Sequence, residues 1–294
     1  MRPASAGSSA KQGPLPEAAP PALVTPQKSH GGDQAVKIIH LTDTHLVGFG
    51  TVHGADPAAR LAGAVASINA EHGDAAHVIV TGDLTENGEA AAYARFAEEI
   101  AKLTMPVHLM LGNHDNPDAF RQIFPTAPCD DTGFTQSAID TPQGRLLLLD
   151  THLPGSHAGR YCEARRDWLA RQLARPGPVM VFMHHPPFDI GIPSLDAIKL
   201  QEAEAFHAVL APHKSRIRHL FFGHVHRALW GTWRGIPYSA MRGLNHQVGL
   251  NLTGPADRML GNFEPPAYGV ALITDDQVTV HLHDYADPSP DILL

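Results

Sequence analysis

The chain has 294 residues and a formal net charge of −8, with 43% hydrophobic and 18% charged residues. This composition is typical of a globular protein with a sizeable core and excludes an intrinsically disordered chain. Basic residues form no run long enough to follow a phosphate backbone, which argues against a nucleic acid as a stable partner. No stretch approaches the roughly 20 apolar residues of a membrane span, so we expect no membrane partner.

The N-terminal segment differs in composition from the rest. Residues 1–35 are rich in Pro, Ala, Gly and Ser and contain no apolar core of a secretory signal, which predicts a disordered tail. Residues 36–294 are predicted to form the folded domain. The chain has two cysteines, Cys129 and Cys162, and so few suit reduced thiols and a cytoplasmic location.

From Val36 onwards, short apolar runs alternate with longer amphipathic segments. The apolar runs are "VKIIHLTD", "HVIVTGD", "VHLMLGNHD", "LLLLDTH", "PVMVFMHH" and "HLFFGHVH". Continuous apolar runs of this length predict strands that are covered on both faces. Asp56 and Pro57 mark a helix start and Gly73 its stop. Three further helices are expected, over residues 88–103, 163–177 and 200–213. The alternation predicts an α/β fold with a largely parallel sheet, whose ligands bind at the carboxyl ends of the strands.

The pattern changes after His226. Strands joined by short turns are expected, without helices between them, over residues 228–235, 236–243, 268–276 and 277–284. They predict a second, more antiparallel sheet packed on the first. Residues 243–266 are predicted to form a long loop, which suggests a lid or an oligomer contact and hence a homodimer.

Polar residues of metal-ligand type follow the predicted strands. They form the five blocks Asp43-Thr44-His45, Gly82-Asp83, Gly112-Asn113-His114-Asp115, His184-His185 and Gly223-His224-Val225-His226. Carboxylate and neutral imidazole are good ligands for Zn, Mn and Fe. Each block alone has an ordinary explanation, since a Gly-Asp pair is simply a turn. Five blocks together, all at strand ends, indicate a metal site.

In this order the blocks resemble those of the calcineurin-like metallophosphoesterase superfamily, over the chain from Val36 to His226. The resemblance implies a four-layer αββα sandwich of two mixed sheets flanked by helices. It also implies two metal ions, of Fe, Mn or Zn. By position, the ligands would be Asp43, His45 and His226 for the first metal, Asn113, His184 and His224 for the second, and Asp83 as the bridge between them.

The resemblance also implies roles at the substrate. Asp83 and His114 would be the catalytic residues, with His114 facing the phosphate. Asp115 either supports His114 or a ligand from behind or is a simple turn residue. His185 and His246 are predicted substrate contacts, although His246 can also be an ordinary loop histidine.

Two branches of the superfamily fit poorly. Purple acid phosphatases carry a Tyr ligand where this chain has Glu86, and protein phosphatases carry an Arg-Gly that "GDLTENG" lacks. "LGNHD", "FMHHPP" and "RGLNHQV" resemble bacterial class III cyclic-nucleotide and glycerophosphodiester phosphodiesterases. The resemblance therefore implies hydrolysis of small phosphodiesters by a metal-activated hydroxide. A phosphomonoesterase, a 2′,3′-cyclic nucleotide phosphodiesterase or nuclease on the same centre, and a non-catalytic protein with a vestigial site remain alternatives.

Overall fold

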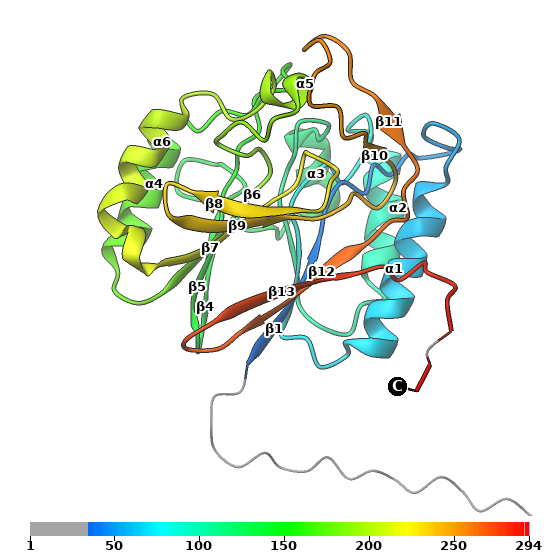
Figure 1. The fold of residues 1–294 in the computed structure, drawn as a ribbon, viewed down its shortest axis with the longest axis horizontal. Helices are drawn as coiled ribbons and strands as arrows, with labels where there is room; N and C mark the ends of the chain where they lie inside the picture. The colour runs from blue at the N-terminus through cyan, green and yellow to red at the C-terminus, as the bar shows by residue number, and fades with distance from the viewer. Residues whose placement is uncertain (1–34, 291, 294) are drawn as a thin grey trace, which may run out of the picture. The chain divides into compact units, whose positions relative to one another are not determined.

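Two mixed sheets form the centre of the computed structural model, which describes residues 35–290 and 292–293 (Figure 1). The predicted tail, residues 1–35, lies outside the described residues except for Ala35. The first sheet has the order β13-β12-β1-β2-β3. Its strands are β1 (Val36–Leu41), β2 (His77–Val80), β3 (Val107–Leu109), β12 (Tyr268–Ile273) and β13 (Val278–His283). The first three are parallel, and β12 runs antiparallel to β1.

The second sheet has the order β4-β5-β6-β7-β9-β8. Its strands are β4 (Ser137–Thr141), β5 (Gly144–Leu148), β6 (Val179–Met183), β7 (Ile217–Phe222), β8 (Leu229–Trp233) and β9 (Ile236–Ala240). Strands β5, β6, β7 and β9 are parallel, and the two edge strands β4 and β8 are antiparallel to their neighbours. A separate pair, β10 (Gln247–Val248) and β11 (Gly261–Asn262), lies inside the segment 243–266.

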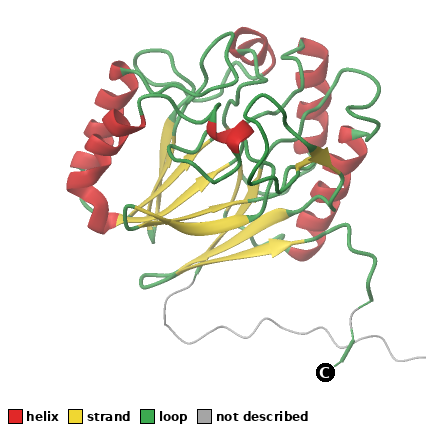
Figure 2. Cartoon of the chain, turned by 45° about the horizontal axis from the view of Figure 1, so that its top comes forward, coloured by secondary structure: helices red, strands yellow, loops and turns green. Residues whose placement is uncertain are grey.

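Helices cover the outer faces of both sheets, and the connecting loops gather at one side (Figure 2). On the first sheet lie α1 (Pro57–Glu71) and α2 (Ala90–Ile100), and on the second α4 (Glu163–Ala174) and α6 (Ala203–Leu210). Shorter helices are α3 (Pro117–Ile123), α5 (Pro193–Asp196) and the 3₁₀ helix η1 (Ala211–Arg216). The predicted αββα sandwich is confirmed. Within the described residues, none of the helices combines the length and the apolarity that crossing a membrane requires.

The start of α1 follows the rules that its sequence suggested. The Asp56 side chain accepts hydrogen bonds from the backbone N–H groups of Ala58 and Ala59, and Pro57 takes the first helical position. The helix ends at Glu71, with His72 as its C-cap, directly before the expected stop at Gly73. Its boundaries were therefore predictable from capping alone.

The assignment of strands to sheets was wrong. The parallel strands that precede His226 do not share one sheet, since β1, β2 and β3 lie in the first and β5, β6 and β7 in the second. The C-terminal strands also divide, with β12 and β13 joining the first sheet and β8 and β9 the second. An apolar run shows that a strand is buried on both faces, but it does not show which neighbour the strand pairs with.

The two sheets pack through a buried apolar layer of their own. Phe182 of β6 and Phe221 of β7 stack with ring centroids 4.5 Å apart, and both contact residues of the first sheet. His40 of β1 lies edge-on to both rings and forms a hydrogen bond with Thr81. This layer fixes the carboxyl ends of β1, β2, β6 and β7 beside one another.

Candidate metal centre

Ligand-type side chains from both sheets meet where these strands end. One group consists of Asp43, His45, Asp83 and His226, all buried, with one donor atom from each within 4.8 Å of the others. The Nε2 atoms of His45 and His226 lie 3.1 Å apart, and His226 Nε2 lies 3.3 Å from an oxygen of Asp43. Two ring nitrogens at this distance repel each other unless a proton or a cation lies between them.

The second group lies on the other side of Asp83. His184 Nε2 is 3.3 Å from Asp83 Oδ2 and 3.2 Å from Asn113 Oδ1. His184, His185 and His224 also have ring nitrogens within 4.8 Å of one another. The structure thus brings all seven predicted ligands together, with Asp83 adjacent to both groups.

The backbone at these positions is unusual. Five of the predicted ligands have positive φ angles between 48° and 68°, and they are Asp43, His45, Asp83, His224 and His226. Side chains other than glycine rarely adopt this left-handed conformation, which costs energy for each residue. It turns the chain out of the strand within one residue, so that residues on either side of Thr44 or of Val225 face the same site.

Two glycines allow the loops to approach closely. A β-carbon at Gly112 would lie 2.2 Å from Asp83 Oδ1, and one at Gly223 would lie 2.0 Å from Thr42 Oγ1. Either distance is far below van der Waals contact. Glycine is therefore required before Asn113 and before His224 for the blocks to pack together.

The ring nitrogens that face away from the centre are held by hydrogen bonds. His184 Nδ1 lies 2.7 Å from the carbonyl oxygen of Thr81, and His226 Nδ1 lies 2.7 Å from that of His246. A carbonyl oxygen only accepts, so each Nδ1 carries a proton and each Nε2 is the nitrogen directed at the centre, where a metal ion would displace any proton that it carries. This arrangement is the one that orients metal-binding imidazoles.

Glu86 does the same for His45, which sequence reasoning missed. Its carboxylate oxygen lies 2.6 Å from His45 Nδ1. Burial would raise the pKa of Glu86, but the imidazole of His45 lowers it. The sequence held a signal, because Glu86 follows the Asp83 block by three residues and a carboxylate partner is common for a metal-binding His.

A second missed residue, His157, orients Asn113. The amide Nδ2 of Asn113 donates to His157 Nδ1 at 3.1 Å, which leaves Oδ1 of Asn113 on the side of His184. The amide oxygen is the atom that binds a metal. His157 lies in the loop after β5, where no local pattern distinguishes it from other loop histidines.

Burial and charge together make the centre attractive to cations. Burial would raise the pKa values of Asp43 and Asp83, but the imidazoles of His226 and His184 hold both below their ordinary range. Conversely, burial lowers the pKa of His184, and the carboxylates of Asp83 and Asp43 raise it to about 9. Two buried carboxylates thus create a negative potential that positive charge must offset.

An unpaired ring nitrogen also shows that the donor set fits metal ions. His224 Nε2 is buried and has no hydrogen-bond partner among the described residues. Burial, together with the charge of His184, lowers the pKa of His224 to about 3, so the ring is neutral near pH 7. A buried, unpaired lone pair on a neutral imidazole is what a metal ligand offers before the metal binds.

His114 and Asp115 make different hydrogen bonds near this centre. The backbone N–H of His114 donates to Asp83 Oδ1, and its ring Nδ1 lies 2.8 Å from the carbonyl of Glu86. Asp115 accepts hydrogen bonds from the backbone of Leu84, Thr85 and Gly112 and from the hydroxyl of Tyr93. Burial and the charge of Asp83 raise its pKa to about 6. Asp115 therefore ties the loop after β2 to the loop after β3.

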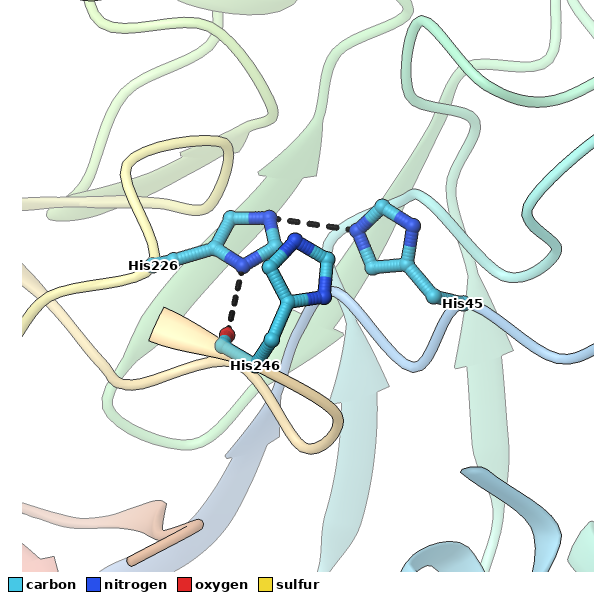
Figure 3. Close-up of side chains that lie close together, drawn as sticks. All are labelled: His45, His226 and His246. Atoms are coloured by element: carbon cyan, nitrogen blue, oxygen red, sulfur yellow. Dashed lines mark hydrogen bonds between the residues drawn. The ribbon is translucent and has the colours of Figure 1, made fainter. Parts of the chain in front are cut away.

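The two other histidines predicted to contact substrate have different surroundings. His246 approaches the rings of His45 and His226, with centroid distances of 4.9 and 4.5 Å (Figure 3). His185 is fully buried, and its ring nitrogens lie 2.8 Å from Thr151 Oγ1 and 3.2 Å from the carbonyl of His157. His246 faces the cavity, whereas His185 packs behind His224.

A cavity of about 380 Å³ opens over the centre. Its lining includes, on the metal side, His45, Asp83, Asn113, His114, His224 and His226, and, from other segments, His53, Ser194, His246, Ala256, Asp257 and Met259. A volume of this size suits a small ligand.

The comparisons with known proteins agree with this arrangement. Residues 36–228 match the calcineurin-like phosphoesterase family. The chain belongs to this family. The match begins at β1 and ends two residues after His226, so it contains every one of the seven predicted ligands.

Several relatives within the calcineurin-like phosphoesterase family are similar along most of their length. A probable cyclic nucleotide phosphodiesterase of Rhodopseudomonas palustris is 42% identical, over 84% of this chain and 91% of that protein. A probable glycerophosphodiester phosphodiesterase of Arcobacter nitrofigilis is 30% identical, over 83% and 91%. Among solved structures, a dimetal phosphatase from Danio rerio has a TM-score of 0.66 at 17% identity and covers 86% of this chain and 97% of that one, which supports the fold.

Proposed function

We propose that this protein is a dinuclear-metal phosphodiesterase that hydrolyses small diesters, either 3′,5′-cyclic nucleotides or glycerophosphodiesters. The observation that carries the proposal is the convergence of seven ligand-type side chains, from both sheets, below a small cavity that also contains His114. The relatives from Rhodopseudomonas palustris and Arcobacter nitrofigilis are named for these two substrate classes.

The ligand assignment follows the two groups of donors. Asp43, His45 and His226 would hold the first metal, Asn113, His184 and His224 would hold the second, and Asp83 would be shared by both. The proximity of Asp83 to His45 and His184 supports the bridging role, since its Oδ2 lies 3.8 and 3.3 Å from their Nε2 atoms. When bound, two such ions supply Lewis acidity to the phosphoryl group and lower the pKa of a water.

The residues of the chain supply orientation and proton transfer. The carbonyl of Glu86 keeps a proton on His114 Nδ1, so Nε2 is the nitrogen that faces the substrate. In the protonated ring, Nε2–H donates its proton to the leaving oxygen of the diester. The N–H of His114 holds Asp83 Oδ1 at 2.9 Å, so the proton donor and the bridging carboxylate keep a fixed separation.

Three further proposals concern the identity of the metals, the cellular location and the segment 243–266. Asp, Asn and His without thiolate suit Fe, Mn or Zn, and we propose a pair from these three metals. The few cysteines suit the cytoplasm. Leu250, Leu252, Leu260 and Phe263 in the segment 243–266 are exposed, which supports the proposal of a homodimer contact or lid there.

A substrate panel with defined metal loading tests the proposal. The panel contains bis(p-nitrophenyl) phosphate, 3′,5′-cyclic AMP, glycerophosphocholine, p-nitrophenyl phosphate and a short oligonucleotide, each with protein reloaded with Mn²⁺. We expect turnover of diesters that is lost with a chelator and restored by metal. Preference for the monoester or the oligonucleotide would favour the phosphatase or nuclease alternative, and inactivity on all five would favour a vestigial site.

A further inference from the structure

A second cluster of metal-binding side chains lies away from the catalytic cavity. Glu71 and His72 stand at the C-terminal end of α1, and His283 is the last residue of β13. One donor atom from each lies within 4.8 Å of the other two. We call these three residues the helix–hairpin cluster. His283 lies beyond the family match, which ends at residue 228, and none of the three residues belongs to the catalytic centre.

The ring of His72 makes no hydrogen bond within the described part of the chain. Both of its ring nitrogens are buried, and neither has a partner among the described residues. A neutral imidazole carries one N–H donor and one lone pair, and buried polar groups of either kind are nearly always satisfied. The ring of His283 lies against it, with centroids 5.3 Å apart and planes nearly perpendicular. His72 therefore has a free lone pair beside another imidazole.

Glu71 and His283 present their donor atoms towards the same place. Nε2 of His283 lies 3.3 Å from Oε2 of Glu71. The hydroxyl of Ser67 donates to the other carboxylate oxygen, Oε1, at 2.8 Å, and so fixes the direction of the carboxylate. Tyr268 stacks on the His283 ring at 4.8 Å, which fixes the plane of that imidazole. Supported donors of this kind are characteristic of built metal sites.

The surrounding charge permits a cation. Lys37 is the nearby base, and its Nζ lies 2.5 Å from the carboxylate of Asp74. This ion pair offsets the positive charge of the lysine, and Glu71 adds a negative charge at the cluster itself. The side chain of Glu71 is half exposed, so an ion from solvent can reach the cluster from the carboxylate side.

We propose that Glu71, His72 and His283 bind a third metal ion, Zn²⁺ or a similar transition cation, that joins the end of α1 to the β12–β13 hairpin. Two imidazoles and one carboxylate are a recurrent zinc set, with water in the fourth position. The two nitrogen donors exclude Mg²⁺ and Ca²⁺, which take oxygen ligands. The role is structural, because the cluster holds two segments that are far apart in the sequence.

The proposal predicts that the unmodified protein binds one more equivalent of zinc than variants that lack a residue of the helix–hairpin cluster. This difference should hold whatever the occupancy of the catalytic centre. The whole chain is saturated with Zn²⁺, passed over a desalting column and measured for zinc per chain by inductively coupled plasma mass spectrometry. We expect His283→Gln and Glu71→Gln each to bind one equivalent less than the unmodified protein. His281→Gln is the matched control, because it removes an exposed histidine from the same strand without touching the cluster.

Thermal unfolding gives the second measurement. Added Zn²⁺ should raise the melting temperature of the His281→Gln control more than that of His283→Gln, while diester turnover of the metal-loaded proteins stays equal. Equal zinc content and equal zinc-dependent melting shifts in the control and in both cluster variants would overturn the proposal. His72→Ala, compared without zinc, separates loss of the metal from loss of packing, since a packing defect lowers the melting temperature in zinc-free buffer as well.

Discussion

The two sides of the catalytic cavity are built differently. On the metal side, His45, His184 and His226 are buried and each has its outer nitrogen held by a carboxylate or a carbonyl. On the loop side of the lining, Ala256, Asp257 and Met259 are exposed and belong to the long segment between β10 and β11. One side is fixed by strands and the other by a surface loop.

This difference separates the chemistry from the choice of substrate. A rigid, pre-oriented set of ligands keeps metal positions constant, whereas loop residues change without disturbing the fold. We therefore expect substitutions on the metal side to affect metal content and turnover, and substitutions on the loop side to affect substrate affinity. Four predictions test this division.

The largest effect is expected from the residue next to both donor groups. Asp83→Ala should lower turnover of bis(p-nitrophenyl) phosphate by at least about 1,000-fold, because it removes the proposed bridge between the two metals. Metal content should fall in the same variant. Asp118→Ala is the control, because that carboxylate is on the surface of α3. Activity near that of the control would show that Asp83 is not the bridge.

Two neighbouring residues should separate metal binding from proton transfer. Asn113→Ala should weaken metal binding, while His114→Ala should keep both metals and lower kcat by about 100-fold or more. The measurement is metal per chain beside steady-state kinetics for each variant. Equal metal loss in both variants would show that the two roles are wrongly assigned.

An intermediate effect is expected from Glu86, which contacts the outer nitrogen of the predicted ligand His45. Glu86→Gln should lower metal affinity or turnover by about 10- to 100-fold, because the amide holds His45 less firmly than the carboxylate does. A metal titration of activity measures it. Glu89→Gln serves as the control, since Glu89 is exposed and makes no capping hydrogen bond. If the two variants behave alike, the contact between Glu86 and His45 has no functional role.

The smallest effect is expected from the loop side. His246→Ala should raise KM by about three- to tenfold and leave metal content unchanged, which is the loss expected for one hydrogen bond. Kinetics with a cyclic nucleotide and with a glycerophosphodiester measure it. His246 also lies within ligand range of His45 and His226. Loss of metal in this variant would therefore place His246 on the metal side.

Sequence reasoning predicted more of the metal side than of the loop side. Asp43, Asn113 and His224 each follow an apolar strand and a change of direction, and the parallel topology brings such positions together. Glu86 and His157 were missed because each acts through another side chain and its own neighbours in sequence are ordinary. The local sequence pattern identifies the ligands, but it does not identify the residues that orient them.

The fold likewise combines features that depend on adjacent residues with features that depend on residues far apart in the sequence. The cap at Asp56 and the boundaries of α1 depend on adjacent residues, so they were predictable. The pairing of β12 with β1 joins residues at opposite ends of the domain, and β7 pairs in parallel with β9 although β8 comes between them in the sequence. Nothing in a strand's own residues specifies such a partner.

The predicted ligands come from two different sheets, so the apolar layer between the sheets also determines how far apart the ligands lie. Asp43, His45, Asp83 and Asn113 follow strands of the first sheet, and His184, His224 and His226 follow strands of the second. The packing of Phe182 and Phe221, both of the second sheet, against first-sheet residues such as Ile38 and Ile79 therefore sets the separation of the two sets of ligands. A drift in core volume during evolution would change metal spacing while leaving every ligand intact. Homologues with complete ligand sets can accordingly differ in activity, and a survey of ligand positions alone would overlook the cause.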